Sequence, residues 1–220
     1  MATQLDLQEQ EQLDDIKAFW RQYGNLITWV LVLALGGFAA WTGWNTWQRN
    51  QGVKAAAMYD ALEVAANAGD SARATQVFGD LKGTYPRTAY AGQGGLVAAK
   101  LQFDKGQPDE ALATLAWVAD NASEDEYRTV ARLRAAGILI DKKQYDDALR
   151  QLEAAKSTGF EALVADRRGD VLLAQGKQDE AKAAYQAAWK AMDAKLEYRQ
   201  LIDAKLTALG AAPAASGVAP

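Results

Sequence analysis

The distribution of apolar and polar residues divides the chain into two parts. From Leu26 to Trp44 the sequence is uncharged and mostly apolar. At a helical rise of about 1.5 Å per residue this run is roughly 28 Å long, close to the thickness of bilayer hydrocarbon. After it, helix-favouring residues dominate and short breaks containing glycine recur. The pattern predicts an all-α protein, with a single N-terminal transmembrane helix followed by a helical domain.

The apolar run carries tryptophan toward both of its ends. Trp29 lies near its start, and Trp41, Trp44 and Trp47 follow at helical spacing near its end. Tryptophan prefers the headgroup boundary of a membrane, and the core helix of a soluble protein does not need this arrangement. A cleaved export signal has a short basic start and a shorter apolar run, whereas the leader here is long and acidic. We therefore expect an uncleaved membrane anchor.

The turns that follow the anchor resemble one another. Three match closely and a fourth more weakly, at Gly106–Leu112, Lys143–Leu149, Gly176–Lys182 and Gly69–Ala74. Each contains an alanine in the same place, and these alanines are 37, 37 and 33 residues apart: Ala74, Ala111, Ala148 and Ala181. A period of about 34 residues is typical of tetratricopeptide repeats. The alternative is an ordinary helical bundle with similar loops.

Small and large residues keep a fixed spacing around these alanines. Four residues after each one is a large side chain, at Phe78, Leu115, Leu152 and Tyr185. Twelve residues before the last three is a small one, at Ala99, Ala136 and Gly169. Small residues let two helices approach closely and the large ones fill the remaining space. The spacing predicts a solenoid of helical hairpins.

The turns also set the expected helix boundaries. We expect four hairpins, Val53–Asn67 with Ser71–Gly83, Arg87–Asp104 with Pro108–Asn121, Asp125–Asp141 with Tyr145–Lys156, and Phe160–Gln175 with Gln178–Met192. A further helix, Ala194–Leu209, would cover the open end of the stack. The resulting domains are a short acidic head at 1–25, the transmembrane helix at 26–44, the repeat domain at 45–209 and a disordered Ala/Pro tail at 210–220.

Composition narrows the possible functions. The chain contains no cysteine and no histidine, which excludes cysteine nucleophiles, histidine bases, disulfides and zinc sites built from these ligands. After the anchor, 22 basic residues balance 23 acidic ones, so no general basic face is available for nucleic acid. We expect no enzyme, no cofactor, no metal ion and no nucleic-acid partner.

Charge near the anchor does not decide the orientation of the chain. Lys17 and Arg21 lie on one side of the apolar run, and Arg49 and Lys54 lie on the other. The positive-inside rule counts basic residues close to the membrane, and the count is tied. Both orientations remain open from the residues alone.

Two sets of residues are candidates for binding partners. The first helices of stacked hairpins are expected to line a concave face, where the candidate groove residues are Leu96, Lys100, Phe103, Leu133, Ile140, Asp166 and Asp170. Small residues four apart in the anchor allow another membrane helix to approach closely, and they are Gly36, Ala39, Ala40 and Gly43.

Three stretches resemble the bacterial YfgM family: LDDIKAFWRQYGN in the head, GWNTWQRNQ after the anchor and, most specifically, FEALVADRRGDVLLAQGKQDEAKAAYQAAW. The resemblance covers about residues 12–209. It implies an ancillary subunit of the SecYEG translocon in the bacterial inner membrane, with a cytoplasmic head and a periplasmic repeat domain. The implied partners are the lipid bilayer, SecYEG, a PpiD-like periplasmic chaperone and exported polypeptides.

The expected function is therefore that of a membrane-anchored accessory to protein export, whose repeat domain scaffolds chaperones or binds newly exported proteins. The alternative is a membrane-tethered repeat adaptor in another envelope-assembly or signalling complex. The identity of the partner separates these two functions.

Overall fold

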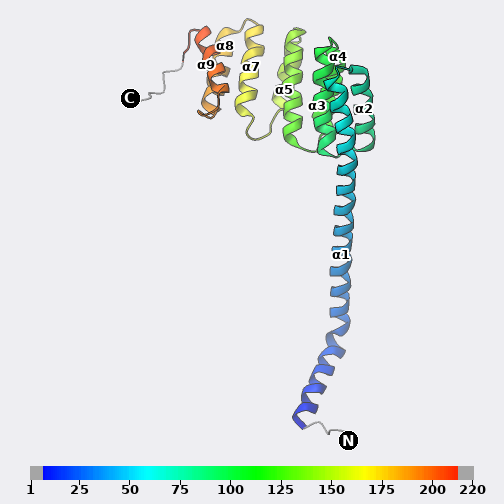
Figure 1. Cartoon of the computed structure of the whole chain (residues 1–220). Helices are drawn as coiled ribbons and strands as arrows, with labels where there is room; N and C mark the ends of the chain where they lie inside the picture. Colours follow the sequence, from blue (N-terminus) through cyan, green and yellow to red (C-terminus); the bar gives the residue numbers. More distant parts are fainter. Residues whose placement is uncertain (1–6, 213–220) are drawn as a thin grey trace. The chain divides into compact units, whose positions relative to one another are not determined.

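The computed structural model describes residues 7–212, and every regular element in this range is an α-helix (Figure 1). The helices are α1 (Leu7–Asn67), α2 (Ser71–Thr84), α3 (Ala89–Asp104), α4 (Pro108–Asn121), α5 (Asp125–Asp141), α6 (Tyr145–Ala154), α7 (Glu161–Ala174), α8 (Gln178–Ala191) and α9 (Tyr198–Ala208). The predicted all-α fold is confirmed. Most of the tail predicted to be disordered lies outside the described residues.

The chain divides into two units, residues 1–50 and residues 51–220. In the first unit α1 carries the apolar run, and its large side chains are exposed, for example Leu26 at 64% and Leu33 at 70%. Within residues 7–212, one helix is long and apolar enough to cross a membrane, and its apolar stretch has no buried residue. A core helix of a soluble protein would bury these side chains, so their exposure supports a membrane span.

In the second unit the four repeat alanines, and the large side chains that follow them, are buried. All four are at most 1% exposed, and the large residues that follow them are at most 3% exposed. The end of α1 packs in the same way, because Leu62 shares one core cluster with Phe78 of α2 and Ala98 of α3. The packing expected from the small and large spacing is therefore present in the structure.

Each hairpin turn is closed by the same pair of backbone hydrogen bonds. At the second turn the N–H of Gly106 donates to the carbonyl of Phe103, and the N–H of Gln107 donates to the carbonyl of Gln102. Such a turn needs one residue with a left-handed backbone, usually glycine. Gly69, Gly106 and Gly176 supply it, with φ of 68°, 74° and 79°.

The predicted boundaries hold to within two residues except at two helix starts. The helix expected to begin at Val53 is part of α1, which begins at Leu7, and α9 begins four residues later than expected. Between α8 and α9 the Asp193 side chain accepts a hydrogen bond from the backbone N–H of Lys195, at 2.9 Å. An aspartate that binds the backbone in this way stabilises a turn at the expense of the helix. The capping helix therefore starts at Tyr198.

The first helices of successive hairpins lie next to one another. α3 contacts α5, and α5 contacts α7. Close approach within a hairpin comes from glycine: a Cβ added to Gly95 of α3 would lie 2.3 Å from Val118 Cγ2 of α4. The row α3, α5 and α7 presents the surface on which the candidate groove residues were predicted.

Candidate functional site

A groove of about 590 Å³ runs across α3, α5 and α7. Its lining includes five of the seven predicted groove residues, namely Lys100, Phe103, Leu133, Ile140 and Asp170. They come from three successive hairpins and are brought together only by the stacking of the repeats. Residues that the prediction did not include also line it, among them Arg134, Asp141 and Arg167.

The apolar part of the groove is accessible. Phe103 is 41% exposed, while Leu133 and Ile140 are half-buried against the core between α5 and α7. Fully burying an exposed side chain of this size contributes about 1.5–3 kcal/mol, and covering the exposed part of Phe103 contributes a fraction of that. The groove can therefore bind an apolar side chain of a partner.

The charged residues of the groove are mostly engaged with neighbours. Lys100 forms an ion pair with Asp104 one turn along α3. Arg134 donates a hydrogen bond to the Leu96 carbonyl at 2.9 Å, which links α5 to α3. Partial burial lowers the pKa of the Arg134 guanidinium, although the residue as a whole is exposed. The guanidinium stays cationic at neutral pH, because the ordinary pKa of arginine lies far above neutrality.

Two predicted groove residues are not part of this lining. Leu96 is 8% exposed and belongs to the core between α3, α4 and α5. Asp166 is 1% exposed, and its carboxylate faces α9 rather than the groove. Leu96 and Asp166 therefore hold the domain together in this structure instead of presenting a surface to a partner.

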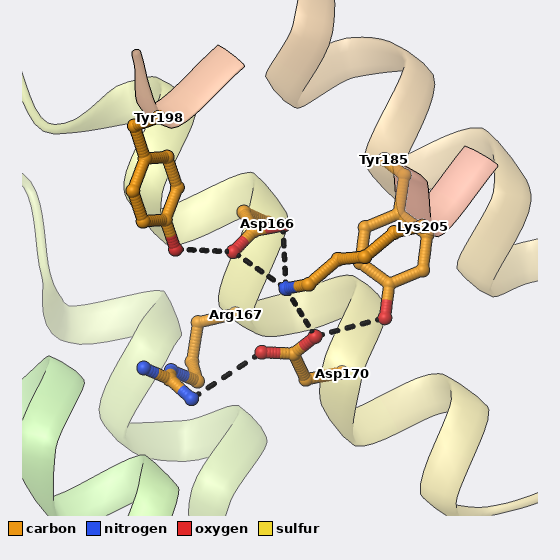
Figure 2. Close-up of polar contacts among 6 residues, drawn as sticks. All are labelled: Asp166, Arg167, Asp170, Tyr185, Tyr198 and Lys205. Atoms are coloured by element: carbon orange, nitrogen blue, oxygen red, sulfur yellow. Dashed lines mark hydrogen bonds and ion pairs between the residues drawn. The ribbon is translucent and has the colours of Figure 1, made fainter. Parts of the chain in front are cut away.

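Asp166 belongs to a polar cluster that joins α7 to α8 and α9, drawn in Figure 2. Its carboxylate accepts a hydrogen bond from the Tyr198 hydroxyl at 2.8 Å and two from Lys205 Nζ at 2.8 and 2.9 Å. Both donors come from α9. The sequence carries no sign of this contact, because Lys205 lies 39 residues away from Asp166.

Asp170 completes the cluster one turn further along α7. It accepts hydrogen bonds from Lys205 Nζ at 2.7 Å, from the Tyr185 hydroxyl at 2.8 Å and from Arg167 at 3.3 Å. Two carboxylates thus face one ammonium and one guanidinium group, so the formal charges balance. A buried cluster of charges is tolerated when its members are paired and hydrogen-bonded in this way.

The two tyrosines of the cluster remain neutral donors. Burial raises the pKa of Tyr185, and its hydrogen bond to Asp170 raises it further. Burial raises the pKa of Tyr198 in the same way, with a further rise from Asp166. We call Asp166, Asp170, Tyr185, Tyr198 and Lys205 the α9 latch, because these residues fix the capping helix to the last hairpin. Within residues 7–212, no group of three or more acidic side chains is arranged to hold a metal ion.

The small residues of the anchor lie on an open helix face. Gly36, Ala39, Ala40 and Gly43 are all exposed. A Cβ added to Gly36 or Gly43 would meet no atom of the described chain within 4 Å. This face has room for a second helix.

Comparison with known proteins identifies the family. A model of the tetratricopeptide repeat-like domain matches residues 17–211. A protein of Neisseria gonorrhoeae named ancillary SecYEG translocon subunit is 31% identical, over 92% of this chain and 98% of the relative. One of the same name from Escherichia coli is 30% identical, over 83% of this chain and 87% of the relative. The chain belongs to the YfgM family.

Membership confirms the resemblance found in the sequence and the tetratricopeptide-like architecture. The family is of a non-enzymatic kind. Together with the apolar N-terminal helix, membership fits a single-pass protein of the inner membrane.

Proposed function

We propose that the protein is an ancillary subunit of the SecYEG translocon, anchored by residues 26–44, with the head at 1–25 in the cytoplasm and the repeat domain of residues 45–209 in the periplasm. The proposal rests on the name shared by relatives that align over almost their full length. The orientation is the one implied by the family resemblance. The tail at 210–220 has no role in the proposal.

The repeat domain binds apolar segments of a periplasmic partner in the groove across α3, α5 and α7. The observation that carries this assignment is the exposure of Phe103 beside Leu133 and Ile140 in one groove. The partner in this proposal is a newly exported polypeptide or a PpiD-like chaperone, the two that the family resemblance implies. The groove binds and does not catalyse, so no cofactor is required.

The anchor contributes a second contact, with a membrane helix of the translocon. The exposed face of Gly36, Ala39, Ala40 and Gly43 supports this assignment, because small residues let helix backbones approach closely in a membrane. The anchor and the groove would then bind different components at the same translocon.

Photo-crosslinking in intact cells tests both contacts. A photoreactive amino acid is placed at Gly36 in the anchor or at Leu133 in the groove. The matched control positions are Phe38, which is exposed on a different face of the anchor, and Arg150, which is exposed on α6. We expect SecY-type adducts from Gly36, and adducts to exported chains or a periplasmic chaperone from Leu133, each stronger than from its control.

Adducts to an unrelated complex from both positions would overturn the translocon assignment and favour an adaptor in another envelope-assembly or signalling complex. Adducts to cytoplasmic proteins from Leu133 would overturn the orientation. Equal yields of adducts from Leu133 and Arg150 would show that the groove is not the binding site.

A further inference from the structure

The head of the chain carries an apolar stripe outside the membrane-spanning run. Its members are Leu13, Ile16, Phe19, Trp20 and Tyr23. At 100° per residue they fall within an arc of about 120° on one side of α1. Each is at least 40% exposed, and Phe19 and Tyr23 pack against each other, with ring centroids 5.0 Å apart. The stripe has no partner within the described residues.

Charged residues occupy the opposite side of the same helix. Asp14, Asp15, Lys17 and Arg21 are all exposed, and Lys17 forms an ion pair with Asp14 at 3.0 Å. A helix with one apolar face and one charged face is suited to the boundary between lipid and water. Trp20 and Tyr23 favour the same boundary, because each combines an apolar ring with a polar group.

An upright helix would leave this stripe in water. If α1 continued along the membrane normal from Leu26, then Tyr23 would lie about 5 Å beyond the hydrocarbon edge and Leu13 about 20 Å beyond it. The headgroup layer is only roughly 5–8 Å thick. The apolar face of Leu13 and Ile16 would then be fully hydrated.

The backbone between the head and the anchor is suited to a bend. The Thr28 hydroxyl donates a hydrogen bond to the Gly24 carbonyl at 2.8 Å, and a side chain that binds the carbonyl four residues back tends to bend a helix. Gly24 itself has no side chain, and the ring of Trp20 lies over it. Figure 1 shows α1 changing direction near its dark-blue end.

We propose that residues 13–23 form an interfacial helix that lies in the headgroup layer, with the apolar stripe toward the lipid tails. The occupant of the stripe is the bilayer that the anchor already crosses, and the stripe runs directly into that anchor. At 100° per residue Lys17 lies about 40° from the edge of the stripe, where it can meet lipid phosphates, and Arg21 lies further round on the charged side. The proposal goes beyond the translocon assignment and holds for either orientation of the chain.

Site-directed spin labelling of the full chain tests this placement, and the absence of cysteine permits single labels without other changes. The variants are Ile16→Cys on the stripe, Ala18→Cys on the charged side and Leu33→Cys in the anchor as a reference. Each is labelled with a nitroxide in vesicles of phosphatidylethanolamine and phosphatidylglycerol. Accessibility is measured to oxygen, which concentrates in lipid, and to a water-soluble nickel chelate.

We expect the ratio of oxygen to nickel accessibility at position 16 to be several-fold higher than at position 18, and to approach the value at position 33. Similar, water-like ratios at 16 and 18 would overturn the proposal, since the head would then stand in water. Shielding of position 16 from both reagents only when SecYEG is added would also overturn it, because a protein would then cover the stripe. A water-like ratio at position 33 would overturn the anchor and the interfacial helix together, without bearing on the groove.

Discussion

In the hairpins α3–α4 and α5–α6, a buried alanine on the first helix shares a core cluster with a buried leucine on the second. The pairs are Ala99 with Leu115 and Ala136 with Leu152. At the equivalent positions of α7–α8 the residues are Gly169 and Tyr185, and Tyr185 is only 1% exposed. The larger ring occupies the space that the missing methyl group leaves free.

Tyr185 also contributes to the attachment of α9 at the end of the repeat array. A leucine at position 185 would fill the core, but it could not donate a hydrogen bond. The Tyr185 hydroxyl reaches Asp170 and joins the α9 latch, so the last hairpin is built to receive the capping helix. The earlier hairpins instead pack against the next repeat through apolar clusters, with neutral or backbone hydrogen-bond acceptors such as the Leu96 carbonyl that receives Arg134.

The largest expected effect comes from removing the carboxylate at the centre of the latch. Asp166→Ala leaves the Tyr198 hydroxyl without its acceptor and removes one of the two carboxylates that pair with Lys205, which keeps Asp170 at 2.7 Å. Breaking a buried pair on one side typically costs about 3–5 kcal/mol. Because Lys205 is 23% exposed and can rehydrate, we expect a loss of about 2–4 kcal/mol in the free energy of unfolding. Urea unfolding of the full chain in detergent, followed by circular dichroism, measures it.

The matched control for this substitution is Asp146→Ala, which removes an exposed carboxylate from the first turn of α6. It should cost less than about 1 kcal/mol, through the helix dipole alone. Equal losses from the two substitutions would contradict the assignment of Asp166 to the latch.

Overpacking of the α7–α8 contact is expected to have the next largest effect. A Cβ at Gly169 would lie 2.4 Å from the Tyr185 ring, so Gly169→Ala must displace either the ring or the helix. Overpacking costs typically 1–3 kcal/mol, and we expect a loss of about 2 kcal/mol in the same unfolding experiment.

The double variant Gly169→Ala with Tyr185→Leu tests the comparison directly, because it copies the alanine and leucine of the earlier hairpins. It should recover part of the stability lost in Gly169→Ala. If it is less stable than Gly169→Ala alone, the hydroxyl of Tyr185 contributes more than the relief of overpacking.

Alkaline pH is expected to weaken the latch. Burial raises the pKa of Tyr185 and Tyr198 above the ordinary value of about 10. A group whose pKa is raised on folding contributes its full stabilisation below the unfolded pKa and loses it as the pH rises further. We expect the urea midpoint to fall more steeply above pH 10 in the natural chain than in the double variant Tyr185→Phe with Tyr198→Phe. Parallel curves would show that these hydroxyls do not titrate with unfolding.

The sequence predicted the repeats better than it predicted the groove. The spacing of Ala74, Ala111, Ala148 and Ala181 reports contacts between helices that are neighbours in sequence, and all four are buried. Counting along α7 placed Asp166 on the groove face, but its side chain faces α9. The position of α9 depends on contacts such as Lys205 with Asp166, which no repeated spacing encodes. The binding roles of the groove residues and of the anchor glycines remain predictions.

The smallest expected effect concerns the turn of the third hairpin. Lys143 adopts the left-handed backbone, with φ of 60°, where the second and fourth turns have Gly106 and Gly176. This conformation costs a residue with a Cβ about 1–2 kcal/mol, partly offset by the greater freedom of glycine in the unfolded chain. We expect Lys143→Gly to stabilise the domain by about 0.5–1 kcal/mol, seen as a higher urea midpoint.

Gly106→Ala makes the opposite change at the second turn. A Cβ at Gly106 would meet no other atom within 4 Å, so Gly106→Ala changes only the backbone preference and should cost about 1 kcal/mol. A destabilising Lys143→Gly together with a neutral Gly106→Ala would show that the left-handed residue does not limit the stability of either turn. Together, Lys143→Gly and Gly106→Ala measure the conformational cost of the turn separately from the side-chain packing that distinguishes the hairpins.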